Sequence, residues 1–186
     1  MLGMVAGVAA LRAARALGAG TAMLKWPNDV VVDERKLCGI LLEGDQCEGA
    51  PPLVLVGMGM NLASQDELAA LGPAPTDVRD RYLGICDLAG GQAAEVYEPA
   101  LTVLVRELAA GYEQWLAAGA GPALAAWREA DALLGARVRA QAAGGQVVGE
   151  ACGISAWGAL RVRTEAGVVE VSSGEVLRVR ADQAPR

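Results

Sequence analysis

The stretch from residue 21 to residue 61 constrains the fold most, because strand-like alternation is joined there by very short links. The segment TAMLKW alternates with a period of two, so Met23 and Lys25 share one face and Leu24 and Trp26 share the other. The turn PND leads into VVV, the charged tip DERK leads into LCGILLE, and the apolar run PPLVLVGMGMNLA follows. Such links join neighbouring strands in opposite directions, so we predict a largely antiparallel sheet with the last strand at its centre.

Apolar residues recur at helical spacing before and after this segment in the sequence. We predict helices over residues 2–17, within RDRYLGICDLAG, over 95–118 and over about 120–133. The long helix carries an apolar stripe formed by Leu101, Leu104, Val105, Leu108, Tyr112, Trp115 and Leu116. Arginines interrupt the first helix and no basic leader precedes it, so we expect neither a signal peptide nor a membrane span, and a cytoplasmic protein.

The sequence pattern changes at Gly135, after which glycine turns separate five short alternating segments. These segments are ARVRAQ, QVVGEACGI, GALRVRT, GVVEVSS and GEVLRVR. A meander of short strands predicts a small barrel that leans on a larger neighbour. We therefore predict an α+β protein, with a mixed, largely antiparallel sheet and helices in residues 1–134 and a small β-barrel in residues 135–183.

The composition excludes several kinds of chemistry. The chain has no histidine, which excludes histidine triads, histidine general bases and histidine-ligated zinc. The four cysteines form no CxxC pair, so we expect reduced thiols and no metal site at Cys38, Cys47, Cys86 and Cys152. A formal net charge of −6 argues against a general nucleic-acid binder. Any catalysis must therefore rest on lysine, arginine, carboxylates, amides or backbone groups.

Glycines interrupt the apolar strands where a ligand could lie. Gly57, Gly59 and Asn61 share one face of their strand by period two. Glycine is unfavourable inside a strand, so two on one face indicate either a flat slot for a thin ligand or close packing of a helix. Gly39 breaks the preceding strand similarly, and there a β-bulge is an equal alternative.

Lys25 gains a function if it faces the same slot as the glycines. A cation beside a desolvated slot suits an anionic substrate or a phosphate; otherwise the lysine extends to solvent at the end of its strand. We expect Trp26 and Cys38 to belong to the core. The tip formed by residues 33–36 is either a solvated turn or a contact for a nucleotide or a partner.

These segments together resemble the catalytic core of biotin protein ligases. The motif of that family runs KWPND, then K-(I/L)-x-G-I-L-x-E, then (I/V)-G-x-G-(I/L/M)-N. The matching residues are Lys25, Trp26, Pro27, Asn28, Asp29, Lys36, Gly39, Ile40, Leu41, Glu43, Gly57, Gly59 and Asn61. The tail, with its G-I-x-x-x-G-x-L and S-G-E-V signatures, resembles the small SH3-like barrel of the family. The resemblance implies a core like that of class II aminoacyl-tRNA synthetases.

The resemblance also implies an activity and roles for residues. In the family, the carboxylate of biotin attacks the α-phosphate of ATP, and a lysine of a biotin carboxyl carrier protein then attacks the biotinyl-5'-AMP. Lys25 would be the catalytic cation, and magnesium would accompany ATP. The residues implied to bind biotin or the adenylate are Trp26, Asn28, Gly39, Ile40, Gly57, Gly59 and Asn61. Arg178 or Arg180 would reach the nucleotide.

The resemblance finally implies partners and an alternative. The acceptor would be the biotin carboxyl carrier protein of acetyl-CoA carboxylase or a similar domain, with no DNA and no membrane as partner; a homodimer is left open. The family's Gly-Arg-rich loop, several dozen residues before KWPND, has no counterpart in this sequence. We therefore expect an N-terminally truncated ligase. The alternatives are a non-catalytic fragment acting as a binding or partner module, and a lipoate-handling relative.

Overall fold

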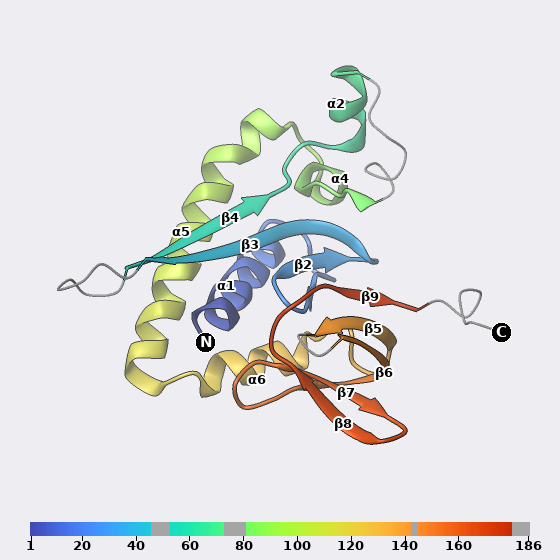
Figure 1. The fold of residues 1–186 in the computed structure, drawn as a ribbon. Coiled ribbons are helices and arrows are strands. Elements are labelled where there is room, and N and C mark those ends of the chain that lie inside the picture. The colour runs from blue at the N-terminus through green and yellow to red at the C-terminus, as the bar shows by residue number, and fades with distance from the viewer. Residues whose placement is uncertain (46–52, 73–80, 143–144, 180–186) are drawn as a thin grey trace.

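The computed structural model describes residues 1–45, 53–72, 81–142 and 145–179, which form two antiparallel sheets with helices (Figure 1). The first sheet has the order β1-β2-β3-β4. Its strands are β1 (Met23–Lys25), β2 (Asp29–Val32), β3 (Arg35–Asp45) and β4 (Leu53–Met60). All three pairings are antiparallel, as the short links predict.

The helices of this part of the molecule are α1 (Leu2–Ala16), α2 (Gln65–Ala70), α4 (Ile85–Ala89), α5 (Ala93–Ala118) and α6 (Gly121–Glu129). They are centred on α1, which packs on one face of the sheet and is itself contacted by α5 and α6. Helix α1 contacts the first three strands, α5 and α6, and its small residues permit this close packing. At Gly7 of α1, a Cβ atom would lie only 2.5 Å from the ring of Trp127, which is fully buried. The predicted helices are confirmed, α6 is shorter than expected, and α2 was not predicted.

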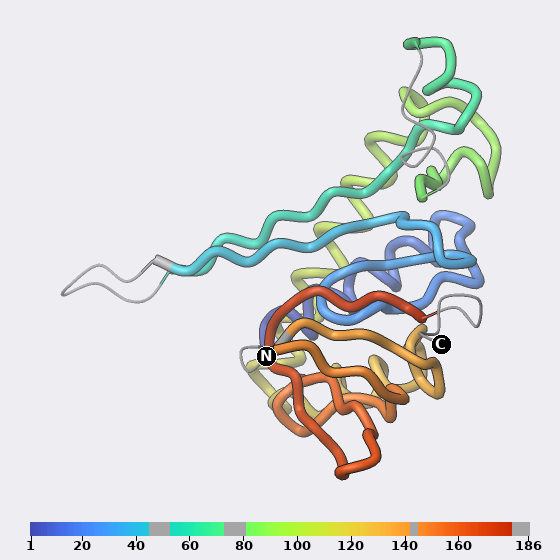
Figure 2. The backbone as a smooth tube through the Cα atoms, turned by 45° about the vertical axis from the view of Figure 1, so that its right-hand side comes forward, coloured from blue at the N-terminus to red at the C-terminus, as the bar shows by residue number. Residues whose placement is uncertain are grey.

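The predicted position of the fourth strand is wrong. Within the described residues β4 lies at the edge of the sheet and pairs only with β3. Figure 2 shows the far ends of these two strands projecting from the rest of the molecule. Leu53 and Leu55 are more than half exposed there, although their continuous apolar run suggested a strand buried on both faces. The strand thus has the apolar composition of a central strand but occupies an edge position.

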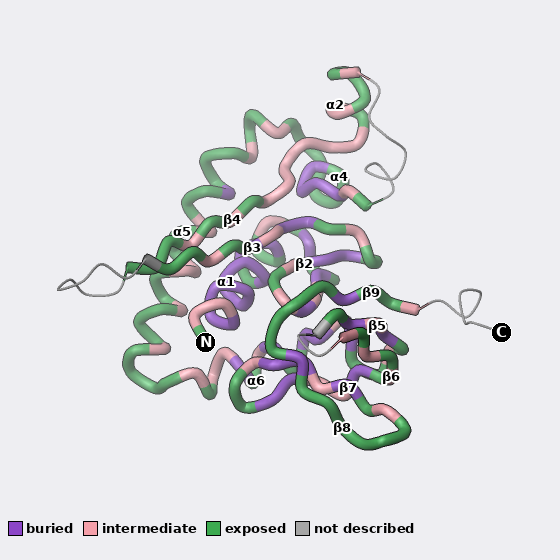
Figure 3. Tube along the Cα trace, viewed as in Figure 1, coloured by how far each residue is buried: buried purple, intermediate pink, exposed green. Residues whose placement is uncertain are grey.

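The apolar stripe of α5 is only partly buried. Leu104 and Leu108 pack against the core, whereas Leu101, Val105, Tyr112 and Leu116 are exposed. Figure 3 shows α5 as an outer helix, exposed along most of its length, with the buried α1 behind the sheet. The helical spacing therefore predicted the helix correctly but overestimated the width of its buried face.

The second sheet follows the five-segment meander that the sequence predicts. Its strands are β5 (Arg137–Ala142), β6 (Gly145–Ile154), β7 (Leu160–Thr164), β8 (Gly167–Val171) and β9 (Val176–Arg178). They are ordered β8-β7-β6-β5-β9, so the last strand returns beside the first. Inward residues at period two, such as Val138, Ala140 and Val162, form the core of this C-terminal β domain.

Three hydrogen bonds join β1 and the residue after it to segments much later in the chain. The link before β5 runs beside β1, with Leu24 N donating to Ala130 O at 2.7 Å and Ala132 N donating to Leu24 O at 2.8 Å. The indole Nε1 of Trp26 donates to Gly158 O of the β domain at 3.0 Å. The middle of β1 and the residue that follows the strand are therefore held by residues far along the chain.

Three of the four cysteines lie within the described ranges. Cys38 and Cys86 are buried, Cys152 is partly buried, and all three are free thiols; Cys47 lies outside the described residues. No helix in these ranges combines the length and apolarity that crossing a membrane requires.

The indole bond to the β domain predicts a measurable loss of stability. Trp26→Phe removes the donor and leaves Gly158 O unpaired, whereas Trp127→Phe removes a buried Nε1 that has no partner among the described residues. We expect Trp26→Phe to lower the free energy of unfolding by about 1 kcal/mol more than the matched Trp127→Phe change. Urea denaturation of both variants measures the difference, and equal losses would contradict the role of this bond.

Candidate functional site

The strand register aligns one residue of each strand of the first sheet on a common face. This central row consists of Lys25, Asp29, Gly39 and Gly59. Directly paired residues point to the same side of a sheet, so a cation, a carboxylate and two glycines share one surface. The adjacent row faces the core and consists of Leu24, Val30, Cys38 and Met60. Lys25 thus shares the face of the glycines, as its proposed function requires.

The glycines of this face differ in what lies above them. A Cβ atom at Gly59 would meet nothing within 4 Å, and one at Gly57 would only touch Leu41 at ordinary contact distance. Gly57 and Gly59 therefore form an open strip of backbone, which we call the glycine shelf. At Gly39 a Cβ atom would lie 2.8 Å from the Nζ atom of Lys36. The space above Gly39 is thus filled by a lysine from the same strand.

Lys36 is the residue of this face that the sequence analysis missed. It lies in β3, beyond the turn at Asp33 and Glu34, whose φ angles are 49° and 67°. Strict alternation would place Lys36 and Gly39 on opposite faces, because they are three residues apart. The register shifts between Val30 and Val31, and the extra residue in β3 returns Lys36 to the face of Gly39. The family motif already contained this lysine, but only the bulge shows that its side chain lies on the face of Gly39.

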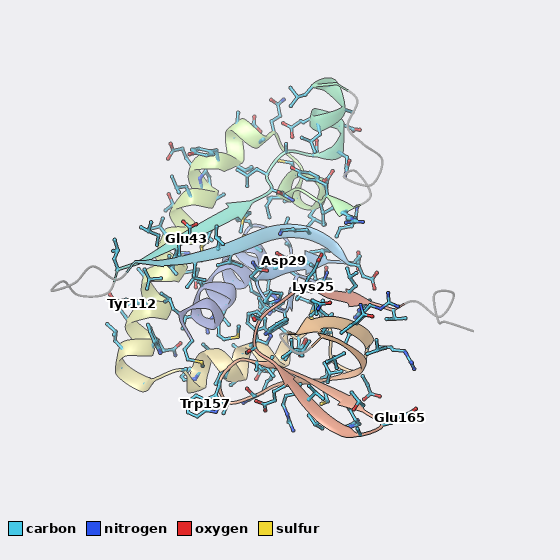
Figure 4. All side chains as sticks on the ribbon, viewed as in Figure 1. Lys25, Asp29, Glu43, Tyr112, Trp157 and Glu165 are labelled. Atoms are coloured by element: carbon cyan, nitrogen blue, oxygen red, sulfur yellow. The ribbon has the colours of Figure 1, made fainter. Side chains whose placement is uncertain are left out.

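A pocket lies between this face and the β domain. It has a volume of about 350 Å³, and its lining residues are Lys25, Trp26, Pro27, Asn28, Asp29, Lys36, Gly174, Glu175 and Val176. Figure 4 shows Lys25 and Asp29 in this region, between the first sheet and the strands of the β domain. Lys25 and Lys36 are also the only lysines in the sequence; every other basic residue is arginine. Both compact ammonium groups therefore line one pocket.

The two lysines differ in their partners. The Nζ atom of Lys36 lies 2.7 Å from Asp29 Oδ1, and the two side chains are 51% and 21% exposed. Lys25 is partly buried and forms no hydrogen bond or ion pair with any described residue. The pocket thus holds one paired cation and one cation that is available to an anion.

The predicted asparagines brace β3 in this structure. Asn28 Nδ2 donates to Ile40 O at 2.7 Å, and Ile40 N donates to Asn28 O at 2.9 Å. Asn61 Nδ2 donates to Lys36 O at 2.8 Å. The side chain of Ile40 is buried in the core, opposite the glycine face, so only its backbone is placed to contact a ligand there, and its role in binding stays a prediction. Trp26 is buried, as expected, and only its edge lines the pocket.

The arginine predicted to contact a nucleotide has other partners. Arg178 donates to Glu34 Oε1 at 2.7 Å and to Ala132 O, so it joins β9 to the hairpin tip and to the link before β5. It does not line the pocket. Arg180 lies outside the described residues. The tip of residues 33–36 is therefore a contact between the sheets and not merely a solvated turn.

Two titratable groups lie beneath the site. Burial raises the pKa of the Cys38 thiol to about 12, against the opposing effect of nearby Lys36, so Cys38 is a core residue and no nucleophile at neutral pH. Asp131 lies beside β1, and burial raises the pKa of its carboxyl despite a hydrogen bond from Leu133 N. Its Oδ2 atom has no partner among the described residues.

Asp131 predicts a pH dependence of stability. Because its folded pKa is raised, its contribution is fully present below the ordinary pKa and is lost as pH rises through the folded pKa. We expect Asp131→Asn, which does not titrate, to flatten the decline in stability as pH rises above the ordinary pKa of an aspartate carboxyl. Urea denaturation across this rise in pH, compared with wild type, tests the assignment. Parallel curves for the two proteins would show that Asp131 titrates normally.

Parts of the chain match the models of known protein families. Residues 1–61 match the Biotin/lipoate A/B protein ligase family, and residues 133–179 match the Biotin protein ligase C terminal domain. The chain is 38% identical over 159 residues to a biotin–[acetyl-CoA-carboxylase] ligase of Mycobacterium tuberculosis, covering 84% of this chain and 53% of that protein. It is 31% identical over 178 residues to the same ligase of Paracoccus denitrificans, covering 91% of this chain and 70% of that protein.

Solved structures agree on the fold. The biotin protein ligase of Aquifex aeolicus matches with a TM-score of 0.80 in its apo form, at 22% identity, over 96% of this chain and 75% of that one. The same enzyme in complex with biotin and ATP matches with a TM-score of 0.78, over 96% of this chain and 71% of that one. The chain spans about half the length of several curated relatives that it matches. By its sequence relatives and its α+β fold with a C-terminal β domain, the chain belongs to the biotin protein ligase family.

Proposed function

We propose that this chain is a biotin protein ligase, which forms biotinyl-5'-AMP from biotin and ATP and transfers biotin to a lysine of a carrier protein. The observation that carries the proposal is the pocket with both lysines of the chain, set beside the open glycine shelf. The names of the sequence relatives support biotin as substrate and acetyl-CoA carboxylase as the source of the acceptor.

The first step joins two anions, so it needs fixed positive charge. The carboxylate of biotin attacks the α-phosphate of ATP, the new bond forms the mixed anhydride, and pyrophosphate leaves. Lys25, which has no partner among the described residues, and Lys36, which lies over Gly39, would hold the carboxylate and phosphate oxygens together. A cation aimed at charge that develops in the transition state commonly contributes about 10²–10³-fold in rate.

The second step needs the same charges for another purpose. The amine of the acceptor lysine attacks the carbonyl carbon of the anhydride, AMP leaves with the bonding electrons, and the amine loses a proton. Lys25 and Lys36 would polarise the carbonyl and stabilise the departing phosphate. One pair of lysines can therefore serve both steps without a histidine.

The shelf and the neighbouring backbone suit a thin, fused-ring ligand. Gly57 and Gly59 leave the face of β4 bare, and Asn61 lies at the end of this strip. The amide nitrogens of Asn28 and Asn61 hold β3 in place, so these residues would support the ligand surface rather than grip the ligand. Arg178 would reach a nucleotide only by leaving Glu34, and Arg180 stays a candidate for the same role.

Magnesium would enter with the phosphates of ATP. Among the described residues no three carboxylates or cysteines cluster as a metal site, and Asp29 and Glu175 are the carboxylates that line the pocket. This fits a metal that keeps most of its water and binds through one or two carboxylates and substrate oxygens. Bound there, magnesium would neutralise phosphate charge.

The proposal also covers the organisation of the chain. We infer a catalytic domain over residues 1–134 and a β domain of the SH3-like kind over residues 135–183, in a cytoplasmic protein. The two separate sheets and the family match at residues 133–179 support this boundary. The exposed edge of β4 is compatible with a homodimer or with docking of the acceptor.

A second function of another class is ligand binding without catalysis. The open shelf favours it, because an adenylate on an exposed surface would be lost or hydrolysed. Mixing the chain with biotin, magnesium-ATP and a carrier domain, followed by detection with streptavidin, separates the two. Labelling of the carrier supports the ligase, whereas biotin binding without labelling supports the binding module. Competition with lipoate tests the third, lipoate-handling function.

Removing either lysine should impair catalysis more than folding. We expect Lys25→Met and Lys36→Met each to lower adenylate formation by about 10²–10³-fold, because each removes a cation from the reacting anions. Single-turnover formation of labelled adenylate measures the effect, and Arg106→Met, which removes an exposed cation on α5, is the matched control. Full activity of Lys25→Met with loss in Lys36→Met would move the catalytic role to Lys36 alone.

Filling the shelf should block binding without harming the fold. A side chain at Gly59 meets open space, so Gly59→Val should change the free energy of unfolding by no more than about 0.5 kcal/mol. We expect it to abolish biotin binding in calorimetry. Gly44→Val is the control, because Gly44 also meets nothing within 4 Å but lies five residues from Gly39, on the other face of β3. Normal biotin affinity in Gly59→Val would place the ligand elsewhere.

A further inference from the structure

We propose that Asp29 is a resident counter-ion for Lys36, and that the carboxylate of the substrate displaces it when the ligand binds. Asp29 would thus be a positioning residue that holds the ammonium group in place before the substrate arrives. This inference rests on the proposed function, because it assigns the substrate carboxylate its partner. It concerns an exchange of ion pairs within the pocket.

The first argument is the path of the Lys36 side chain. Asp29 and Gly39 are paired across β2 and β3, and Lys36 reaches Asp29 by lying over Gly39. A Cβ atom at residue 39 would lie 2.8 Å from Nζ and 2.9 Å from Cε of Lys36. Glycine at this position therefore makes room for a lysine rather than for the ligand ring.

The second argument is that the pair is exchangeable. The side chain of Lys36 is 51% exposed, so water competes with Asp29 for the ammonium group. The Asp29 side chain is less exposed, at 21%, so the pair is open to solvent on the side of the lysine. A second carboxylate can therefore approach the ammonium group from the pocket and replace Asp29, whereas a pair buried on both sides would be more costly to separate.

The third argument is the position of the next glycine. Gly59 follows Gly39 in the central row and is open above, so a ligand on the shelf would have its acidic end beside Lys36. The released Asp29 stays within the pocket, because its direct partner in the strand register across β1 and β2 is Lys25, which also lines it. Both lysines and Asp29 line the same pocket, so the exchange needs no movement of a strand.

The test removes the charge of Asp29 and varies the charge of the ligand. Asp29→Asn keeps the size of the side chain but no longer competes for Lys36. We expect it to bind biotin roughly two- to five-fold more tightly than wild type, with unchanged affinity for the uncharged biotin methyl ester. Asp33→Asn, which removes a carboxylate from the exposed hairpin tip outside the pocket, should alter neither affinity.

Lysine signals give an independent readout. Because the chain contains two lysines, selective ¹³C labelling of lysine gives two Hε–Cε signals in NMR spectra. Lys36→Met assigns them by removing one. We expect the Lys36 signal to shift both in Asp29→Asn without ligand and in wild type when biotin is added.

The outcomes are distinct. Equal weakening of biotin and its ester by Asp29→Asn would show a merely structural role and overturn the exchange. Unchanged biotin affinity, or a Lys36 signal that ignores Asp29→Asn, would overturn it as well while leaving the proposed function intact. If neither wild type nor Asp29→Asn binds biotin, the proposed function and the exchange both fall.

Discussion

The register of the β2–β3 hairpin is the constraint on which the site depends. It pairs Asp29 with Gly39, and through β1 and β4 it extends this pairing to Lys25 and Gly59. A slip of one residue would move every one of these side chains to the core face. The bulge beside Val30 and Val31 is part of the same constraint, because without it Lys36 would point into the core instead of toward Asp29. The hydrogen-bond register of the strands thus decides that Lys36 pairs with Asp29.

The β domain contributes to the site through the wall that it forms. The turn before β9 lines the pocket opposite β1, and the bond from Trp26 to Gly158 and the pairing of Leu24 with the link at residues 130–132 hold that wall against the strand carrying Lys25. The Leu24 bonds are made by the backbone alone and depend little on side-chain identity, whereas the bond to Gly158 requires the indole N–H of Trp26. The pocket is consequently formed by residues of the first sheet and of the β domain together.

The distribution of charge explains how so small a site can handle anions in an acidic chain. The net charge is −6, yet both lysines face one pocket, where a carboxylate partner holds one of them and leaves the other available. A compact ammonium group suits a position between two oxygens better than the planar guanidinium used elsewhere in the chain. The open shelf beside the lysines provides the uncharged surface for the rest of the ligand.

The sequence by itself determined the antiparallel strands, the long helices, the five-strand meander and the face shared by Gly57, Gly59 and Asn61, because these follow from local periodicity, and its motif spacing indicated the family. The strand register then placed Lys25 on the face of these glycines. Only the tertiary structure decided that β4 lies at an edge of the sheet, that half the stripe of α5 is exposed, and that Ile40 belongs to the core. It also decided that Lys36 lies over Gly39 and that Arg178 binds Glu34. The physical reason is that a bulge, an edge and a contact between sheets depend on residues distant in the chain, which alternation along one strand cannot report.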